Sequence, residues 1–387
     1  MRIAIDAHSV GTGLGGNESY ATNLIEALAA IDSVNEYTLY VTRPEAVKTF
    51  SDRWPNFTVR QTRPHTPLIR IPLTLSAELR KNPVDVLHVQ FTAPPFAPCP
   101  VVVSIHDLSF EHLPETFKRR SRAQLRLTVR RSARKATHIL ALSEHARADI
   151  VATYGIAPER VTAIPLAAAD RFRPITDEKE LQRVRHTYGI AGDYILTVGS
   201  IQPRKNLRRL ISAYTRLRRE APEATHPSLV IVGRQAWLFG DTLRAIRDSG
   251  FADSIILTGY VPDADLPALY SGARCFVYPS FFEGFGLPPL EAMKCGVPVI
   301  AGNRTSLVEV VADAGILVDS LDSDAIASAL SRVLNDRELR EELSVKGLNR
   351  SRLFRWQETA KRTLEVYERA VDNKRAHILE TREQRLR

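Results

Sequence analysis

The sequence of 387 residues is poor in cysteine and lacks any long apolar run. Cys99, Cys275 and Cys295 lie far apart and without C-x-x-C spacing, which argues against a disulfide framework or a structural zinc site. No run of about 18 apolar residues is present, so we expect no transmembrane helix. The start MRIAIDAHSV also lacks the charged and apolar regions of an export signal. These absences predict a cytoplasmic protein whose membrane contact, if it has one, is peripheral.

Hydrophobic residues make up 44% and charged residues 25% of the chain, which is typical of a globular protein and excludes a disordered class. The length favours two domains, because single domains usually hold about 100 to 200 residues. The formal net charge of +9 suits nucleic acid, an anionic membrane surface or phosphate-bearing ligands. Charge alone does not choose among these partners.

Short runs rich in Val and Ile alternate with amphipathic stretches, as in parallel sheets that are buried on both faces. The rhythm pauses between Asp170 and Gly192 and then resumes, so we predict an α/β chain with two doubly wound, Rossmann-like domains over 1–173 and 174–356. The final helix, about 357–387, is expected to return to the first domain. The expected strands are 2–6, 37–41, 84–89, 101–105, 138–142 and 161–165 in the first domain, and 194–199, 228–233, 254–259, 275–279, 297–302 and 315–319 in the second.

The segment GTGLGG, residues 11–16, matches the pattern G-x-G-x-x-G that opens many dinucleotide-binding domains. Such a site also needs an acidic residue at the end of the second strand, where this chain has Thr42 and Arg43. A nicotinamide or flavin site is therefore disfavoured. Gly15 and Gly16 either let a phosphate or an acceptor approach a helix N-terminus or form a tight turn, and the sequence leaves both interpretations open.

The segment EGFGLPPLE, residues 283–291, contains two glutamates separated by seven residues. Prolines favour a helix start, so Glu283 is expected in the loop after a strand and Glu291 near the beginning of the next helix. Both then face the carboxyl edge of the sheet, where open α/β sheets bind ligands. Two surface glutamates are the simpler alternative, and the surrounding glycines and prolines, which mark a loop, count against it.

The run EGFGLPPLEAMKCGVPVIA resembles the Glu-x7-Glu motif of glycosyltransferase family 4, and the similarity covers nearly the whole chain. The resemblance implies the GT-B fold, in which two Rossmann-like domains face each other across a cleft, the first on the acceptor side and the second binding the nucleotide sugar. It also implies retaining transfer of a sugar from a nucleotide-diphosphate donor. It implies that Glu291 holds the ribose hydroxyls and that Glu283 lies at the sugar. It also implies that no metal and no other cofactor are required.

The loop GSIQPRKN, residues 199–206, follows a strand and opens a helix, which places Arg204 and Lys205 where a diphosphate binds favourably. Fixed cations there stabilise the negative charge that builds up on the departing diphosphate. Lys205 matches the phosphate lysine of the family. Ser200 follows Gly199 where the family often has an arginine, so Arg204 is expected to take over that role. Two ordinary solvated cations are the alternative.

Other strand ends supply further candidates. His106 follows the strand 101–105 and matches a family histidine that touches the donor sugar, while Asp107 beside it either lines the site or caps a helix. Ser143 is better explained as a helix N-cap. Further contacts with the nucleotide sugar are expected from the main-chain amides of Gly284, Phe285, Gly286 and Leu287 and from Gly199, Ser200, Gly233, Tyr260 and Val261, with Glu309 as a secondary candidate.

The resemblance to bacterial mannosyl- and rhamnosyltransferases of polysaccharide assembly makes GDP-mannose the first expected donor, with a UDP- or dTDP-sugar as the alternative. The acceptor is expected to be a glycan or lipid-linked. The family implies front-face attack, whereas double displacement would use Glu283 as nucleophile. A nucleotide-sugar epimerase of the same fold has no use for EGFGLPPLE. Nucleic acid is not an expected partner, since no helix-turn-helix, zinc-finger or RNP-like pattern is present.

The segment 118–135 contains nine Lys and Arg residues and no acidic residue. As a helix it buries a narrow stripe of Leu125, Val129, Ser132 and Ala136 and presents Arg119, Arg122, Arg126, Arg130 and Arg134 on one broad face. Like charges one turn apart repel by about 0.2–0.5 kcal/mol per pair, so an anionic partner is expected. The inner membrane leaflet is that partner in our interpretation, and a merely solvated face is the alternative.

Overall fold

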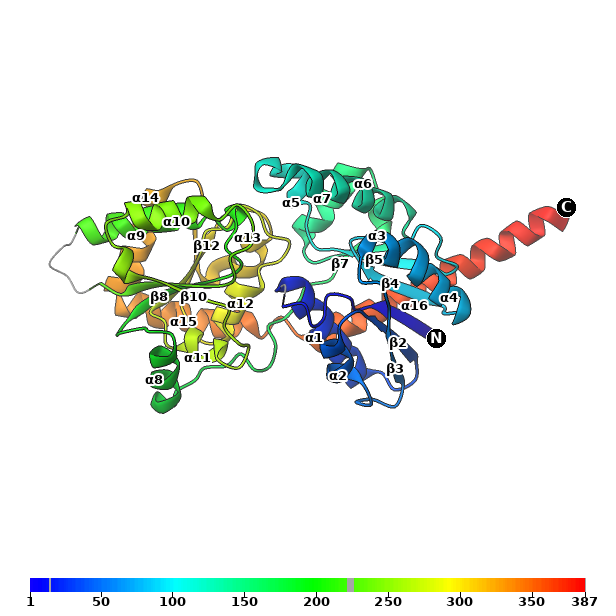
Figure 1. Ribbon diagram of the computed structural model, residues 1–387, viewed down its shortest axis with the longest axis horizontal. Helices are drawn as coiled ribbons and strands as arrows, with labels where there is room; N and C mark the ends of the chain where they lie inside the picture. Colours follow the sequence, from blue (N-terminus) through cyan, green and yellow to red (C-terminus); the bar gives the residue numbers. More distant parts are fainter. Residues whose placement is uncertain (14, 221–225, 387) are drawn as a thin grey trace. The chain divides into compact units, whose positions relative to one another are not determined.

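The computed structural model describes residues 1–13, 15–220 and 226–386, with side chains through Lys374 (Figure 1). The chain divides into two compact units. The first comprises Met1–Glu111, Arg119–Leu166 and the chain from Trp356 onward, and the second comprises His112–Lys118 and Ala167–Arg355. The boundary between the units after Leu166 lies a few residues before the division at 173 that the sequence predicts. Nothing in the sequence indicates that the short segment His112–Lys118 belongs to the second unit.

The first unit contains a seven-stranded parallel sheet in the order β3-β2-β1-β4-β5-β6-β7. Its strands are β1 (Arg2–Asp6), β2 (Glu36–Val41), β3 (Phe57–Gln61), β4 (Val86–Gln90), β5 (Val101–Ile105), β6 (His138–Ala141) and β7 (Val161–Ala163). β1, β4 and β5 are almost wholly buried, as their apolar runs predict. Strand β3 is missing from the sequence prediction because this edge strand is mostly exposed and has no continuous apolar run.

Helices link these strands, as expected for a doubly wound unit. They are α1 (Gly16–Ile31), α2 (Pro44–Phe50), α3 (Pro67–Ile69), the π-helix η1 (Arg70–Leu75), α4 (Ser76–Lys81), α5 (Ser109–His112), α6 (Arg119–Lys135) and α7 (Glu144–Tyr154), with short 3-10 turns at Pro114–Thr116 and Pro158–Arg160. The last helix, α16 (Trp356–Leu386), packs beside α1 and near β4 and β5 of this unit. The Tyr367 hydroxyl lies 2.6 Å from His88 Nδ1 on β4, which ties α16 to the sheet.

The second unit contains a six-stranded parallel sheet in the order β10-β9-β8-β11-β12-β13. The strands are β8 (Tyr194–Val198), β9 (Ser228–Val232), β10 (Ile255–Gly259), β11 (Cys275–Tyr278), β12 (Val299–Gly302) and β13 (Ile316–Val318). The helices are α8 (Glu178–Thr187), α9 (Leu207–Glu220), α10 (Gly240–Asp248), α11 (Leu266–Ser271), α12 (Leu287–Lys294), α13 (Ser306–Val311), α14 (Ser323–Asn335) and α15 (Arg337–Ser351), with 3-10 turns η4 (Pro203–Lys205), η5 (Ala252–Ser254) and η6 (Ala312–Ala314).

Two parallel α/β sheets confirm the predicted fold class of two doubly wound units. The core of the second unit is formed by β8, β9, β11 and the inner faces of α9 and α14, with Leu210, Ile231 and Leu330 at or near zero exposure. Such packing holds the strand ends rigidly, and the strand ends in turn position the loops that follow them. Among the described helices, none is both long and apolar enough to cross a bilayer.

Candidate functional site

The loops after β8 and β11 meet because these strands are neighbours, with Ile195 paired to Cys275 and Leu196 to Phe276. The first loop carries Arg204 and Lys205, and the second carries Glu283, so residues almost 80 positions apart come together. The cations lie in the 3-10 turn η4, just before α9, rather than in the first turn of α9 itself.

Glu283 is the centre of this arrangement. Its carboxylate lies 3.0 Å from Arg204 Nη1 and 2.7 Å from Lys205 Nζ. The same carboxylate accepts hydrogen bonds from Ser280 Oγ at 2.6 Å and from the Tyr278 hydroxyl at 3.1 Å. Burial raises the pKa of the Glu283 carboxyl, but the charges of Arg204 and Lys205 outweigh burial and lower this pKa to about 2. The group is therefore an ionised, fully engaged carboxylate at neutral pH.

The two loops are joined by further hydrogen bonds. Asn206 has φ near 58°, and its Nδ2 donates hydrogen bonds to the main-chain oxygens of Pro279 at 3.0 Å and Ser320 at 2.6 Å. Ser280 Oγ also contacts Arg204 O at 3.0 Å, and Arg204 Nη1 donates to Phe282 O at 2.7 Å. No sequence motif singles out Asn206, Tyr278 or Ser280 as a site residue. The one sequence feature that could have found them is their place beside the two loops that follow β8 and β11.

A second set of contacts shapes the loop between Glu283 and α12. Ser306 Oγ lies 2.8 Å from Glu283 O and 2.9 Å from Phe285 O, so its one proton is shared between these two carbonyl oxygens. Glu283 N donates to Thr305 Oγ1 at 3.1 Å. Gly286 precedes α12 with φ near 108°, a conformation that favours glycine. Leu287 is the first residue of α12, and Phe285 is buried against Phe354. Gly284 is also buried, so the predicted amide loop is compact and held by side chains from β12–α13.

Glu291 lies in α12 and is separate from the Arg204–Lys205–Glu283 cluster in its contacts. Its carboxylate accepts a hydrogen bond from the Tyr270 hydroxyl at 2.9 Å, and Arg171 and Asp263 are its charged neighbours. Burial raises the pKa of Glu291 to about 7, and the Tyr270 hydrogen bond and Arg171 only partly counter this effect. The two glutamates of the motif thus differ, since one is ionised and the other is half-protonated near neutral pH.

The raised pKa makes stability depend on pH. The folded protein holds the Glu291 proton more tightly than the unfolded chain does, whose pKa is near the ordinary value of 4.5. As pH rises from 4.5 to about 7, the folded state is therefore destabilised relative to a Glu291→Gln variant, and above about 7 the difference levels off. Thermal unfolding of the wild-type and Glu291→Gln proteins across this pH range measures the difference in stability. A difference that does not change with pH would show that Glu291 keeps an ordinary pKa.

The glycines at the ends of β8 and β9 serve close packing of the backbone. Gly199 N donates to Val232 O at 2.9 Å, and Gly233 N donates to Gly259 O at 2.9 Å, so both amides already have partners. The main-chain amides of both glycines therefore serve the sheet, and the contact of Gly199 and Gly233 with the nucleotide sugar stays a prediction. Ser200, between Gly199 and the bridge residue Ile201, lies in the same close approach, where an added Cβ on Gly233 would lie 3.3 Å from Ser200 N.

Tyr260 and Val261 follow β10 and have opposite exposure. Tyr260 is 53% exposed, with the Arg234 guanidinium 4.4 Å from its ring centroid, whereas Val261 is buried. The exposed ring is available for stacking, and Val261 contributes to the core. The secondary candidate Glu309 lies in the first turn of α13, with its main-chain oxygen bonded to Arg350.

In the first unit, His106 follows β5 as predicted. Its Nδ1 lies 3.0 Å from Asn17 Oδ1, and its ring packs on Phe91 and Tyr20. Burial lowers the pKa of His106 to about 4, so the imidazole is neutral at pH 7 although Asp107 pulls this pKa upward. Asp107 Oδ1 accepts hydrogen bonds from Ser109 N and Ser109 Oγ at the start of α5, which fits the capping alternative.

The glycine-rich loop before α1 binds its own carboxylate. Gly11 N and Gly13 N donate to the two oxygens of Glu18 at 2.8 and 2.6 Å, which places an anion at the loop from within the chain. Gly15 and Gly16 at the start of α1 face open space where a Cβ would stand. The predicted cap at Ser143 is confirmed, because Ser143 Oγ accepts from Ala146 N at 3.0 Å at the start of α7.

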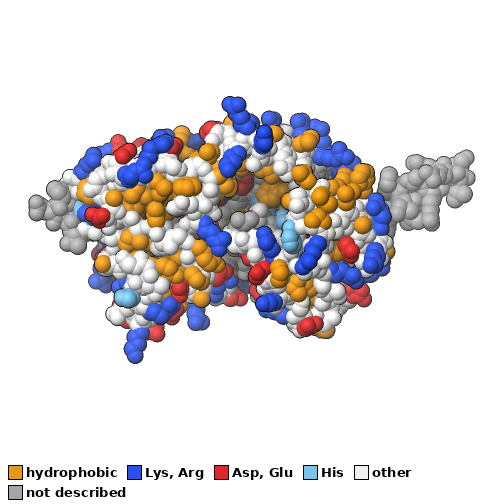
Figure 2. Space-filling view, in the orientation of Figure 1, with side chains coloured by type: hydrophobic (Ala, Val, Ile, Leu, Met, Phe, Trp, Pro, Cys, Tyr) orange, Lys and Arg blue, Asp and Glu red, His pale blue; other side chains and the backbone are white. Residues whose placement is uncertain are grey.

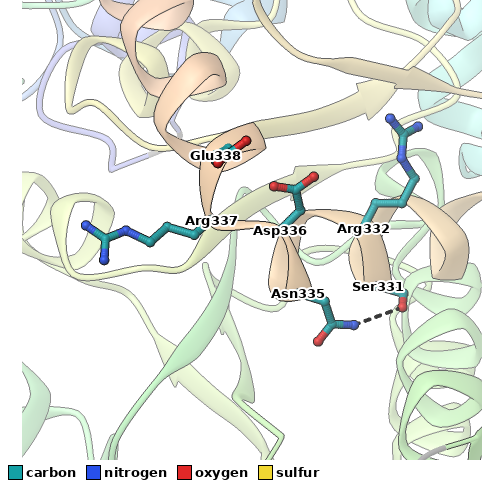
Figure 3. Close-up of a pocket in the computed structure, with 6 residues that line it drawn as sticks. All are labelled: Ser331, Arg332, Asn335, Asp336, Arg337 and Glu338. Carbon is teal, nitrogen blue, oxygen red and sulfur yellow. Dashed lines mark hydrogen bonds between the residues drawn. The ribbon is translucent and has the colours of Figure 1, made fainter.

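One hollow lies away from these strand ends, at the junction of α14 and α15 (Figure 3). Its lining is Ser331, Arg332, Asn335, Asp336, Arg337 and Glu338, none of which the sequence singles out. Asp336 caps α15, and Asn335 Nδ2 donates to Ser331 Oγ, so its polar groups serve the helix ends. Among the described residues, no group of three or more His, Cys, Asp or Glu side chains is placed to hold a metal ion.

Comparison with known proteins covers most of the chain. The family model for glycosyl transferases group 1 matches residues 180–350, and that for Glycosyltransferase Family 4 matches residues 14–168. The O-antigen chain mannosyltransferase B of Escherichia coli is 37% identical over 268 residues, which are 69% of each chain. A GDP-mannose-dependent alpha-(1-6)-phosphatidylinositol monomannoside mannosyltransferase of Mycolicibacterium smegmatis is 32% identical, over 57% of this chain and 59% of that protein.

The fold has solved counterparts. Sucrose-phosphate synthase from Thermosynechococcus elongatus superposes with a TM-score of 0.74 at 19% identity, covering 95% of this chain and 98% of that one. At such low identity the likeness concerns the fold alone, and it agrees with the two parallel sheets described above.

Proposed function

Since this chain belongs to glycosyltransferase family 4 and has the GT-B fold, we propose that it transfers mannose from GDP-mannose to a glycan or lipid-linked acceptor with retention of configuration. The glycosyltransferase activity itself, in polysaccharide assembly, follows from the family and the mannosyltransferase relatives. The observation that carries the proposal is the cluster of Arg204, Lys205 and Glu283 between the loops after β8 and β11. A UDP- or dTDP-sugar is the alternative donor.

The donor diphosphate is held, in this proposal, by Arg204 and Lys205. Their side chains are only 15% and 12% exposed, so their charges act in a weakly screened environment. Without donor, Glu283 pairs with both cations and leaves one net positive charge; with donor, the diphosphate binds to the same two cations. Glu291 accepts from the ribose hydroxyls, and the exposed Tyr260 ring stacks on the base. The relative that is named for its dependence on GDP-mannose supports guanine as this base.

The reaction proceeds by front-face attack. The bond between the anomeric carbon and the diphosphate oxygen breaks, the acceptor oxygen bonds to the same face of that carbon, and the acceptor proton passes to an oxygen of the departing diphosphate. Arg204 and Lys205 stabilise the charge that develops on the leaving group. Glu283 is a poor covalent nucleophile, because its carboxylate already receives two cations and two hydroxyls and its pKa is near 2. It orients the sugar instead.

A donor survey tests this proposal. The purified protein is scanned for thermal stabilisation by GDP-mannose, UDP-glucose and dTDP-rhamnose, since a ligand that binds the folded state raises its unfolding temperature. Donor turnover is then followed with and without excess EDTA. We expect GDP-mannose to stabilise the protein most and turnover to survive the chelator, because Arg204 and Lys205 supply the counter-charge. Loss of turnover that magnesium or manganese restores would contradict metal independence, and stabilisation by another donor alone would replace mannose.

We also propose that α6 docks the protein on anionic lipid. Lys and Arg side chains gather over α6 in the space-filling view (Figure 2), and Arg119, Arg130 and Arg134 are exposed. Two of the expected face residues have local partners, since Arg122 donates to Phe110 O and Arg126 pairs with Glu111. Large apolar side chains lie in the same region: Leu127 of α6 is 72% exposed and Phe96 is 60% exposed. The loop that contains Phe96 is bonded to α6 through Ser132.

Vesicle binding measures this docking. Changing Arg119, Arg130 and Arg134 together to Gln should weaken binding to anionic vesicles at low salt about a hundredfold, because each basic residue near the surface contributes on the order of 1 kcal/mol. The matched control removes the same charge from exposed arginines of the second unit, Arg208, Arg247 and Arg352. Equal loss in both variants would indicate a general charge effect, and no binding by the unmodified protein would rule out docking.

A further inference from the structure

A row of hydrogen-bonded side chains crosses the interior of the first unit, and we call it the buried network: Tyr367 of α16, His88 of β4, Ser104 of β5 and Tyr20 of α1. His88 Nδ1 lies 2.6 Å from the Tyr367 hydroxyl, and His88 Nε2 lies 2.7 Å from Ser104 Oγ. The Tyr20 hydroxyl lies 2.7 Å from the same Ser104 Oγ. The network therefore joins the last helix of the chain to the first one through two neighbouring strands (Figure 1).

All four side chains of the buried network lie in the interior of the unit, each at most 3% exposed. Polar groups are costly to bury, and they are tolerated when they are hydrogen-bonded to each other. A fully bonded network also allows fewer arrangements than apolar packing does, because each hydrogen bond needs its own distance and direction. The network thus specifies how α1 and α16 lie on the sheet more narrowly than their apolar contacts alone would.

His88 couples the two ends of the network. Burial lowers the pKa of His88 to about 3, so its ring is neutral at pH 7 and carries a single N–H. One ring nitrogen then donates and the other accepts. Tyr367 and Ser104 face opposite ring nitrogens, so one of the two hydroxyls donates to His88 while the other accepts from it. The direction of the Ser104 hydroxyl is thereby tied to that of Tyr367.

The Tyr20 end of the network contacts a predicted site residue, His106. The Tyr20 ring packs edge-on against the His106 imidazole, with 4.7 Å between the ring centroids. Asn17, one turn earlier on α1, holds the same imidazole, since its Oδ1 lies 3.0 Å from His106 Nδ1. Residues three apart lie on one face of a helix. The placement of α1 on the sheet therefore determines the orientation of the His106 ring.

The contact with Asn17 also fixes the proton of His106. An amide oxygen can only accept, so Nδ1 of the neutral His106 ring carries the proton and Nε2 is left as an acceptor. His106 Nε2 is buried and has no hydrogen-bond partner within the described part of the chain. It is suited to accept a hydrogen bond from a hydroxyl of the donor sugar, the ligand that the sequence predicts for His106.

We infer that the buried network positions His106 for sugar transfer, and that Tyr367 at its far end is a positioning residue that acts only through the network. This inference rests on the proposed glycosyltransferase function and adds the last helix of the chain to the elements that shape its site. Tyr367 lies 279 positions from His88 in the sequence, and the tertiary fold alone brings the two together.

Removing single hydroxyls tests the inference by kinetics with GDP-mannose. Tyr367→Phe and Tyr20→Phe each delete one end of the network and keep the aromatic ring. Each should lower kcat about tenfold, because a reacting group held in the wrong orientation slows transfer, and should leave donor KM nearly unchanged, because the proposed nucleotide contacts lie in the second unit. If the network acts as one unit, the double variant should lose no more than either single one, whereas independent effects would multiply to about a hundredfold.

The ring nitrogens of His106 provide a readout that loss of stability alone does not change. In the full chain labelled with nitrogen-15 histidine, the ring chemical shifts distinguish a protonated nitrogen from a bare one. We expect the wild type to hold the His106 proton on Nδ1 and both tyrosine variants to populate both tautomers. Thr363→Val is the matched control, because it removes a buried hydroxyl one turn before Tyr367 whose hydrogen bond stays within α16. It should keep the wild-type kcat and tautomer.

The outcomes separate clearly. A lower kcat in both tyrosine variants, no further loss in the double variant and a mixed His106 tautomer support the inference. Wild-type kcat in Tyr367→Phe, a multiplied loss in the double variant, an unchanged His106 tautomer or an equal loss in Thr363→Val overturns it. If one tyrosine variant fails to fold, the other tests the network from its opposite end. The tautomer is measured without donor, so failure of GDP-mannose would overturn the proposed function and leave the network to be judged independently.

Discussion

Replacing Lys205 with alanine is expected to lower sugar transfer about a hundred- to a thousandfold, because removing one fixed charge from a site of developing negative charge has effects of this size. The Lys205 ammonium lies 2.7 Å from Glu283 and also donates to the Tyr278 hydroxyl, so it is held rigidly where the diphosphate is expected. Its loss should act on turnover more than on donor KM, since the leaving-group charge is largest in the transition state. Steady-state kinetics with varied donor measures both.

The fold must be checked independently, because the substitution removes one of two cations from the buried Glu283 carboxylate. The Lys205→Met variant keeps most of the side-chain volume and leaves Arg204 and Glu283 as a one-to-one ion pair, so thermal stability should stay near that of wild type while turnover stays low. Lys179, an exposed lysine of α8, is the matched control, and Lys179→Ala should behave as wild type. If Lys205→Ala retains near-normal turnover, Lys205 does not hold the diphosphate.

Replacing Gly233 with alanine is expected to destabilise the second unit by about 4 kcal/mol or more and to abolish transfer. Gly233 has φ near 146°, and an ideal Cβ there would lie 2.1 Å from Gly199 O and 2.7 Å from Gly199 C. These are main-chain atoms that cannot rotate away, so the loop after β8 must shift. That loop leads into Arg204 and Lys205, and the Lys205 side chain packs against Gly199.

Thermal unfolding and turnover of the Gly233→Ala protein measure the effect. Gly240→Ala is the control, because Gly240 begins α10 and an added Cβ there meets no atom within 4 Å. A surface change of this kind usually stays within about 0.5 kcal/mol. A Gly233→Ala protein that unfolds at the wild-type temperature would mean that the approach of the β8 and β9 loops is looser than described.

Most strands and the two-unit organisation were predictable because their signals are local. A strand such as Val101–Ile105 is buried on both faces and is therefore apolar at every position but Ser104, a pattern that is visible in the sequence. The same holds for the Glu283 and Lys205 loops, whose glycines and prolines mark strand-to-helix connections. The edge strand Phe57–Gln61 was missed, since only Phe57 is buried and a mostly exposed segment of this kind resembles a loop.

The sequence by itself determined the two doubly wound sheets and which loops end at their carboxyl edges, because hydrophobic periodicity and turn residues act over a few neighbouring positions. Only the tertiary structure decided which side chains of those loops meet. Glu283 pairs with cations almost 80 residues away, Glu291 pairs with Tyr270 instead, and Arg70 reaches Asp6 across 64 positions. Such pairings depend on strand order and burial, which no local pattern of residues encodes.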